Sequence, residues 1–374
     1  MDVSSEMIHS LLPVFLTRHL GATMLAVGLL EGAAEATAMV VKVFSGAWSD
    51  WLGRRKPMAL LGYGLGAASK PLFALANSVG MVAAARLIDR TGKGLRGAPR
   101  DALVAELVSE DMRGAAYGLR QALDTVGAFL GPVLGIVLML AWADNFHAVF
   151  WVGVIPAVLA VALLAFGVRE PDAPAGTKRV NPIRRENLRQ LHAAYWWVVG
   201  IGALFTLARF SEAFLVLRAQ RGGLGEAWTP LVLIAMNIVY SLGAYPFGKL
   251  ADQASHRKLL GLGLAVLVLA DLALAAANRG PVLWAGIALW GLHMAITQGL
   301  LATMVADTSP PALRGTAFGV FNLACGIATL LASALAGLLW DRLGGDATFL
   351  AGAAISVAAL AVLAWKAPPE TNGR

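Results

Sequence analysis

The stretch GAWSDWLGRRK fills residues 46–56, between two long apolar segments. A stretch of the same length, GKLADQASHRK, fills residues 248–258, again with a glycine and an aspartate four positions apart before a basic cluster. A second pair agrees with the first, because RGAAYG at 113–118 recurs as RGTAFG at 314–319. The two offsets, 202 and 201 positions, are nearly equal. This agreement indicates an internal duplication of the chain.

The composition excludes a soluble protein. Of the 374 residues, 58% are hydrophobic and 14% are charged, against about 25% charged in a soluble domain. The mean hydropathy is +0.67. Read in windows of about 19 residues, the chain shows twelve apolar segments, at 1–20, 25–49, 58–77, 80–106, 114–141, 147–168, 194–219, 227–250, 258–277, 281–306, 315–340 and 346–366. We therefore expect an all-α polytopic membrane protein of twelve transmembrane helices in two pseudo-symmetric six-helix bundles.

One long polar connection separates six segments from six. Residues 169–193 are rich in proline and basic residues and predict a cytoplasmic linker between a bundle at 1–168 and a bundle at 194–374. The repeat places the counterpart of Ala194 about seven residues before Met1. The first segment is also polar at its start, so we expect either a true start further upstream or an incomplete first helix, and favour the former.

The positive charges are distributed by topology. The net charge is +7 and the pI near 9.8. The basic clusters at 54–56, 169–189 and 256–258, with Lys366 and Arg374, all fall on one side of a twelve-span chain. This positive-inside bias predicts cytoplasmic termini and a multi-pass protein of the plasma (bacterial inner) membrane. The basic pI therefore gives no indication of a nucleic-acid partner.

At these repeated motifs the sequence resembles the major facilitator superfamily of secondary transporters, over essentially its full length. The resemblance implies a gating motif, made of Gly46, Asp50, Gly53, Arg54 and Arg55 with Asp252, Arg113 and Arg314. In that family the aspartate faces the start of another helix, which a carboxylate stabilises. We expect Asp50 near Gly315 and Asp252 near Gly114; a merely solvated basic turn is the alternative.

A second motif, GAFLGPVLG at 127–135, resembles a signature of the antiporter branches of that superfamily. Gly127, Gly131 and Gly135 would let helices approach closely, and Pro132 would provide a bend at a gate. Ile136 replaces the usual closing glycine. A role in packing alone, without bearing on exchange, stays open.

Charged residues follow one face of several spans. At 100° per residue, Arg86, Asp89, Arg90, Lys93 and Arg100 all fall within about 60° on either side of a common line along the helix. The same device occurs in 25–49 (Glu31, Glu35, Lys42), in 114–141 (Arg120, Asp124) and in 1–20 (Glu6, His9). The resemblance implies that these four spans line a central cavity. The third and sixth spans, which it places outside, carry little beyond Lys70.

Ionisable groups at membrane depth are costly unless they are paired or face a polar cavity, so each one is a functional candidate. The proton-coupling candidates are Glu31, Glu35, Asp124, Asp89 and Glu6. The substrate-cavity candidates are Arg86, Arg90, Lys93, Arg120, Arg209, Glu212, Asn237, His293, Gln298 and Asn322. The alternative is that many of these charges form a salt-bridge network that holds one conformation, and that a lone histidine is a packed residue.

The remaining motifs exclude other functions. GKGLRG at 92–97 matches a dinucleotide loop, but such a loop needs a preceding strand, and this stretch lies inside an expected helix. We find no metal-ligand spacing, no nucleophile with a paired base and no P-loop. The single cysteine, Cys325, excludes an intrachain disulfide. The sequence therefore predicts neither an enzyme nor a resident cofactor.

These observations favour a monomeric, proton-coupled secondary transporter working by alternating access in the lipid bilayer. The antiporter-like motif favours export of a small organic molecule. One alternative is a proton symporter that imports an organic anion, favoured by the basic stripe. A second is a non-transporting receptor or assembly subunit with the same fold.

Overall fold

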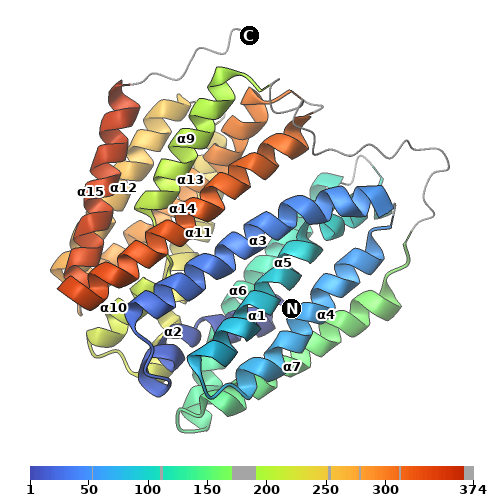
Figure 1. Ribbon diagram of the computed structural model, residues 1–374, viewed down its shortest axis with the longest axis horizontal. Coiled ribbons are helices and arrows are strands. Elements are labelled where there is room, and N and C mark those ends of the chain that lie inside the picture. The colour runs from blue at the N-terminus through green and yellow to red at the C-terminus, as the bar shows by residue number, and fades with distance from the viewer. Residues whose placement is uncertain are drawn as a thin grey trace.

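The computed structural model describes residues 1–52, 54–109, 113–170, 191–251, 254–277, 279–310 and 313–365. Within the helices, only the backbone course is described for a few residues beside these gaps. The described residues are helical throughout, with short connections (Figure 1).

The first half contains six spans. The elements, in chain order, are α1 (Asp2–His9), α2 (Leu12–Val14) and the π-helix η1 (Phe15–His19), then α3 (Met24–Leu52), α4 (Lys56–Ala74), α5 (Val79–Leu107), α6 (Arg113–Ala141), α7 (Phe146–Ala162) and the π-helix η3 (Leu163–Gly167). Serine or asparagine caps two of the helices, since Ser78 accepts from the Met81 N–H and Asn145 from the Ala148 N–H.

The second half repeats this pattern. Its elements are α9 (Ala193–Ala208), α10 (Ala213–Arg221), the 3₁₀ turn η4 (Glu226–Trp228), α11 (Pro230–Ala251), α12 (His256–Ala276), α13 (Pro281–Thr308), α14 (Arg314–Leu343) and α15 (Gly345–Trp365). Pro230 and Pro281 stand at the first helical position, where proline costs no hydrogen bond. Every predicted apolar segment corresponds to helix, which confirms the predicted fold class.

The first and seventh spans are broken, which the sequence reading did not foresee. The first is interrupted at Ser10–Leu11, just before Pro13, which lacks a backbone N–H. The seventh is interrupted at 209–212, where Arg209 adopts extended backbone. The two breaks lie at equivalent positions of the duplication. Within the described residues, nine helical segments are long and apolar enough to cross a membrane. The broken first span, α4 and the charged α5 are the three others.

The two halves lie side by side, with 2–167 on one side and 193–365 on the other, and α3 and α14 run along each other between them (Figure 1). We call the end at residues 54–55, 168–170 and 254–255 the linker end. The end at residues 20–23, 142–145 and 222–225 is the far end. The predicted linker itself, 169–193, lies mostly outside the described residues.

Small residues bring α3 and α14 into close contact. A Cβ added at Gly32 would lie 2.8 Å from Leu330 Cα, and one at Gly326 would lie 3.3 Å from Ala36 Cα. At the far end, the Asp341 carboxylate accepts hydrogen bonds from the Met24 and Leu25 N–H groups, at 2.9 and 2.8 Å. A carboxylate there both caps α3 and complements its dipole.

The apolar core is distributed unevenly between the two ends. One buried cluster contains residues of both halves, among them Leu16, Val27, Phe214 and Trp340, and it fills the far end. A second cluster, which includes Tyr195, Leu260 and Phe321, consists of buried residues of the second half alone. The halves are therefore joined by apolar packing mainly at the far end.

Candidate functional site

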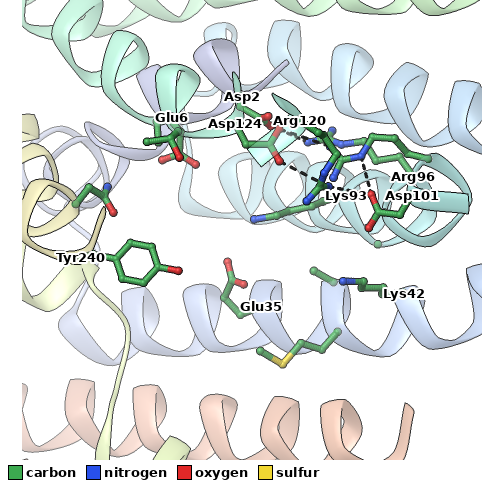
Figure 2. Close-up of a pocket in the computed structure, with 18 of the residues that line it drawn as sticks. Asp2, Glu6, Glu35, Lys42, Lys93, Arg96, Asp101, Arg120, Asp124 and Tyr240 are labelled. Carbon is green, nitrogen blue, oxygen red and sulfur yellow. Dashed lines mark hydrogen bonds and ion pairs between the residues drawn. The ribbon is translucent and has the colours of Figure 1, made fainter. Parts of the chain in front are cut away.

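A cavity of about 530 Å³ lies between the halves, displaced toward the linker end (Figure 2). This volume is within the range of small-molecule sites. Its first-half lining is Asp2, Glu6, Glu35, Ala38, Met39, Lys42, Lys93, Gly94, Arg96, Gly97, Arg100, Asp101, Arg120, Asp124, Thr125, Ala128 and Phe129. Its second-half lining is Asn237, Tyr240, Ser241 and Asn322. One wall is therefore densely charged, and the other is polar but neutral.

The glycine-proline motif of α6 forms a packing surface for α1. A Cβ added at Gly127 would lie 2.9 Å from Asp2 Cβ, and one at Gly131 would lie 2.8 Å from Glu6 Cβ. Gly135 faces Leu11 at 3.6 Å. α6 remains one helix through Pro132. The motif therefore positions two cavity carboxylates, and its role as a hinge stays a prediction.

Buried ion pairs join α3 to α5. Arg86 donates to Glu31 at 2.7 Å, with both side chains at most 2% exposed. One turn away, Arg90 donates to Glu35 at 3.0 Å. His9 lies 3.4 Å from Glu31 and 3.6 Å from Glu6, so α1 joins the same network. Glu6 and Glu35 face the cavity, whereas Glu31, Arg86 and Arg90 lie behind its wall.

Asp89 faces α4 and not the cavity. Lys70 donates to Asp89 at 2.6 Å and to Ser5 Oγ at 3.0 Å, and both charged side chains are at most 3% exposed. Lys70 thus ties the third span to the charge network, although the resemblance places that span outside the cavity-lining helices. Lys70 points inward and neutralises Asp89, which removes Asp89 from the groups that reach a substrate in this conformation.

Arginine–aspartate pairs close the linker-end part of the charged wall (Figure 2). Arg120 donates to Asp101 at 2.8 Å and lies 3.7 Å from Asp124. Arg100 lies 3.3 Å from Asp101 and 3.8 Å from Asp124. Asp124 thus lies in the cavity, as a member of a four-residue cluster whose side chains are 23–34% exposed.

Two lysines on the charged wall stand apart from these pairs. Lys42 and Lys93 both line the cavity, and neither makes an ion pair or side-chain hydrogen bond with another described residue. Arg96, by contrast, lies 3.4 Å from Asp2 and stacks on Tyr63. The one-sided pattern of charges in 80–106 predicted that Lys93 lines the cavity. It did not predict which cations would lack a carboxylate partner.

The predicted residues of the second half divide into two groups. Asn237 and Asn322 line the cavity. Arg209 and Glu212 lie at the break of the seventh span, outside the cavity lining. His293 is buried with its Nδ1 2.8 Å from the Gly263 carbonyl oxygen, and Gln298 is exposed outside the cavity.

Sequence reasoning missed several cavity residues and one buried acid. Tyr240 and Ser241 line the neutral wall, but their types carry no signal in an apolar span. Asp2 appeared only as part of a polar start. Asp271 in α12 is fully buried, and neither carboxylate oxygen has a hydrogen-bond partner within the described part of the chain. Its single charge within LVLADLALA was a usable signal.

The gating motif is described in part. Gly46 packs against Ala98, with an added Cβ at 3.3 Å. Arg55 donates to Ser49 Oγ at 2.9 Å, and the Arg55 and Lys56 N–H groups both donate to the Glu170 carboxylate; Arg54 is exposed. Gly53 and Asp252 lie outside the described residues, as do the side chains of Asp50, Arg113 and Arg314. The contacts expected for the gating motif, Asp50 near Gly315 and Asp252 near Gly114, therefore stay a prediction.

The GKGLRG stretch lies inside α5, without a strand, and its glycines are packing positions. A Cβ added at Gly92 would lie 2.6 Å from the Gly62 oxygen on α4. One at Gly94 would lie 2.7 Å from Val41 Cβ on α3. Among the described side chains, no group of three His, Cys, Asp or Glu residues is placed to hold a metal ion.

Comparison with known proteins agrees with this architecture. A sequence model of the Major Facilitator Superfamily matches residues 1–236 and 223–374. The chain is 32% identical over 363 residues to the uncharacterized MFS-type transporter MJ1317 of Methanocaldococcus jannaschii, covering 95% of this chain and 89% of the relative. It is 26% identical over 345 residues to the multidrug resistance protein MdtH of Edwardsiella ictaluri, covering 89% and 82% of the two chains.

A solved structure of a mutant of the nucleoside transporter NupG has the same fold, with a TM-score of 0.82, 12% identity and 98% coverage of both chains. The twelve-span architecture, the duplicated halves, the cavity between them and the sequence match throughout the chain all agree. The chain is a multi-pass integral membrane protein that belongs to the major facilitator superfamily of transporters.

Proposed function

We propose that this protein is a proton-coupled secondary active transporter that works by alternating access and exports small organic molecules. The observation that carries the proposal is the cavity between the halves, which lies toward the linker end while the far end is filled by apolar side chains of both halves. A single site exposed to one side at a time is the requirement of alternating access. With the linker and both termini cytoplasmic, as the positive-inside bias predicts, this conformation is inward-facing.

Proton coupling is supported by the carboxylates that face the cavity. Glu6, Glu35 and Asp124 line it, and each lies against a histidine or an arginine of another turn or helix. Proton uptake by such a carboxyl releases its partner, so protonation and helix contacts are linked. Glu31 and Asp89 are buried behind the cavity wall. They would take up protons only if their ion pairs with Arg86 and Lys70 open.

Export is supported by two observations. The glycine-proline motif of α6 lies against α1, beside Asp2 and Glu6, so its antiporter resemblance falls at the cavity itself. MdtH, to which the chain is 26% identical, is named as a multidrug resistance protein. We place the protein as a monomer in the bacterial inner membrane, by its resemblance to such transporters.

The second candidate is a proton symporter that imports an organic anion. Lys42 and Lys93 favour it, because unpaired cations on a cavity wall attract an anionic group. A receptor or assembly subunit that kept the fold without transport is the third candidate.

Proteoliposomes with an imposed pH gradient separate these functions. Export by proton antiport predicts that substrate accumulates in right-side-out vesicles only when the lumen is more acidic than the bath, so that protons leave as substrate enters. Symport predicts accumulation only with the opposite gradient. A protein that moves no solute of a diverse panel under either gradient, although it binds one of them, would be a receptor.

A further inference from the structure

We infer that Lys42 and Lys93 form an anion subsite of the cavity, which holds a carboxylate, phosphate or sulfonate group of the transported molecule. The inference rests on the proposed function, of which it names the substrate class. It starts from the pairing of cations along α3, α4, α5 and α6. Arg86, Arg90, Arg96, Arg100 and Arg120 each lie within 4 Å of a carboxylate, and so does Lys70. Among the described cavity-lining cations, Lys42 and Lys93 are the two without such a partner.

The backbone brings these two lysines together. Gly94 on α5 lies so close to α3 that an added Cβ would be 2.8 Å from the Ala38 oxygen and 2.7 Å from Val41 Cβ. Ser45 Oγ strengthens the same contact by donating to the Gly94 oxygen at 2.9 Å. Lys42 follows Val41, and Lys93 precedes Gly94. The closest approach of the two helices therefore fixes both lysine backbones at one level of the cavity.

The side chains share the same surface. Gly97, one turn after Lys93, leaves room for the Lys42 chain, since an added Cβ would lie 3.6 Å from Lys42 Cε. Both lysines belong to the cavity lining, and Figure 2 shows Lys42 and Glu35 on α3, Lys93 on α5 facing them, and Tyr240 across the space.

The nearby carboxylates already have other partners. Glu35 accepts from Arg90 at 3.0 Å, and Glu6 lies 3.6 Å from His9. Asp101 and Asp124 are held by Arg100 and Arg120. An anion entering from outside thus finds two ammonium donors without displacing an arginine. A compact, freely rotating ammonium suits a small oxyanion as a point charge.

The opposite wall indicates what the rest of the molecule is like. Asn237, Tyr240, Ser241 and Asn322 are uncharged hydrogen-bonding side chains, and Met39, Ala128 and Phe129 add apolar surface. The subsite therefore fits a monoanionic or dianionic organic molecule with a neutral, partly apolar body, whichever direction the protein moves it.

The test uses the purified full chain and three probes of one shape, namely benzoate, benzamide and benzylamine, with inorganic phosphate as a small anion. We expect benzoate or phosphate to raise the midpoint of thermal unfolding of the wild type, and the neutral and cationic probes to raise it less. In Lys42→Gln and Lys93→Gln, the dissociation constant for the anion should rise about tenfold or more, as for loss of one charged hydrogen bond. Lys249→Gln, an exposed second-half lysine outside the cavity lining, is the matched control and should bind like wild type.

A charge reversal makes the test specific to ligand charge. Lys93→Glu should lose anion binding and bind benzylamine in preference to benzoate. If both lysine variants bind the anions as wild type does, or if only benzylamine stabilises the wild type, the anion subsite is wrong. Equal loss of transport of charged and neutral solutes with unchanged anion binding would likewise overturn it, by making the lysines conformational contacts.

The failure of the proposed function has a different signature. In that case benzoate or phosphate binds with the expected lysine dependence, but no solute crosses the proteoliposome membrane under any gradient. Conversely, proton-driven transport of neutral solutes alone leaves the proposed function intact and removes the subsite.

Discussion

Lys70 and Asp271 occupy equivalent positions of the two halves, 201 residues apart, in α4 and α12. Lys70 faces Asp89 at 2.6 Å, whereas the residue 201 positions after Asp89 is the buried Trp290. The first half thus holds a neutralised ion pair where the second half has an acid without a described partner. In the second half, aromatic rings pack at this level instead, since Phe210 lies against Trp290 and Phe349, with ring centroids 5.3 and 5.4 Å apart.

The contrast accounts for the electrical asymmetry of the cavity. Charged pairs of the first half are carried by α1, α3, α4, α5 and α6, and their inner members reach the cavity wall. The second half contributes neutral side chains to that wall. A duplicated fold can therefore give one half to charge recognition and leave the other as a shape-defining surface.

The largest effect is expected when a substitution breaks the Lys70–Asp89 ion pair of the first half. Lys70→Met leaves the buried Asp89 with Arg90, at 3.3 Å, as its remaining charged neighbour, and should lower the free energy of unfolding by about 3–5 kcal/mol. The double variant Lys70→Met/Asp89→Leu should recover most of that loss, because no uncompensated charge remains. Unfolding midpoints of the purified proteins measure both, and a double variant less stable than the single one would show that the pair itself stabilises the fold.

The next largest effect is expected from alanine substitutions at Gly62 and Gly263, which are also 201 positions apart. A Cβ at Gly62 would meet the Arg96 nitrogen and the Gly92 oxygen, both at 2.6 Å, so Gly62→Ala must push α4 from α5 at a cost of about 1–3 kcal/mol. At Gly263 the obstacle is a side-chain methyl, Thr297 Cγ2. Gly263→Ala should therefore be rescued by Thr297→Ser, while no single side-chain truncation rescues Gly62→Ala. Melting curves of Gly62→Ala, Gly263→Ala, Thr297→Ser and the double variant Gly263→Ala/Thr297→Ser measure whether the rescue occurs.

A smaller effect is expected where the halves meet. Asp341→Asn removes one of two carboxylate acceptors and the charge that cap α3, worth about 1 kcal/mol. If that contact stabilises the conformation closed at the far end, the ratio of the two conformations shifts about fivefold toward far-end opening. Spin-label distances across the far end report the shift. Unchanged distances together with a lower melting midpoint would limit Asp341 to a cap within this conformation.

The smallest effect is expected at Asp271. Because neither oxygen has a described partner, Asp271→Asn removes no hydrogen bond and should change the free energy of unfolding by less than about 1 kcal/mol, or raise it. Asp89→Asn is the contrasting variant, since it leaves Lys70 unpaired and should be strongly destabilising. If Asp271→Asn lowers the free energy of unfolding as much as Asp89→Asn does, the distinction between the two halves is wrong.

The number, order and class of the spans followed from the sequence because apolar length is a local property. The stripe of α5 did too, since helical period alone places Arg86, Asp89, Arg90 and Lys93 in one sector. Which partner each charge takes was not predictable. Asp89 turns to Lys70 and Arg90 to Glu35, and the difference depends on helix rotations set by Gly92 and Gly94 packing on two different helices. The break near Ser10 has a local signal in Pro13, whereas the stretch around Arg209 contains no proline or glycine that would mark a break.

The glycine contact between α3 and α14 has a mechanical consequence. At Gly32 and Gly326 the two helices meet with little side chain between them, so we expect this contact to oppose a change of crossing angle less than an interlocked apolar seam would. The far end is held shut by the apolar cluster of both halves and, nearer water, by the Asp341 cap and the His19–Glu226 pair at 3.1 Å. A rocking motion of the halves about the α3–α14 contact would open these far-end contacts while leaving the glycine contact assembled. The free-energy cost of such a motion would therefore arise at the far end and not between α3 and α14.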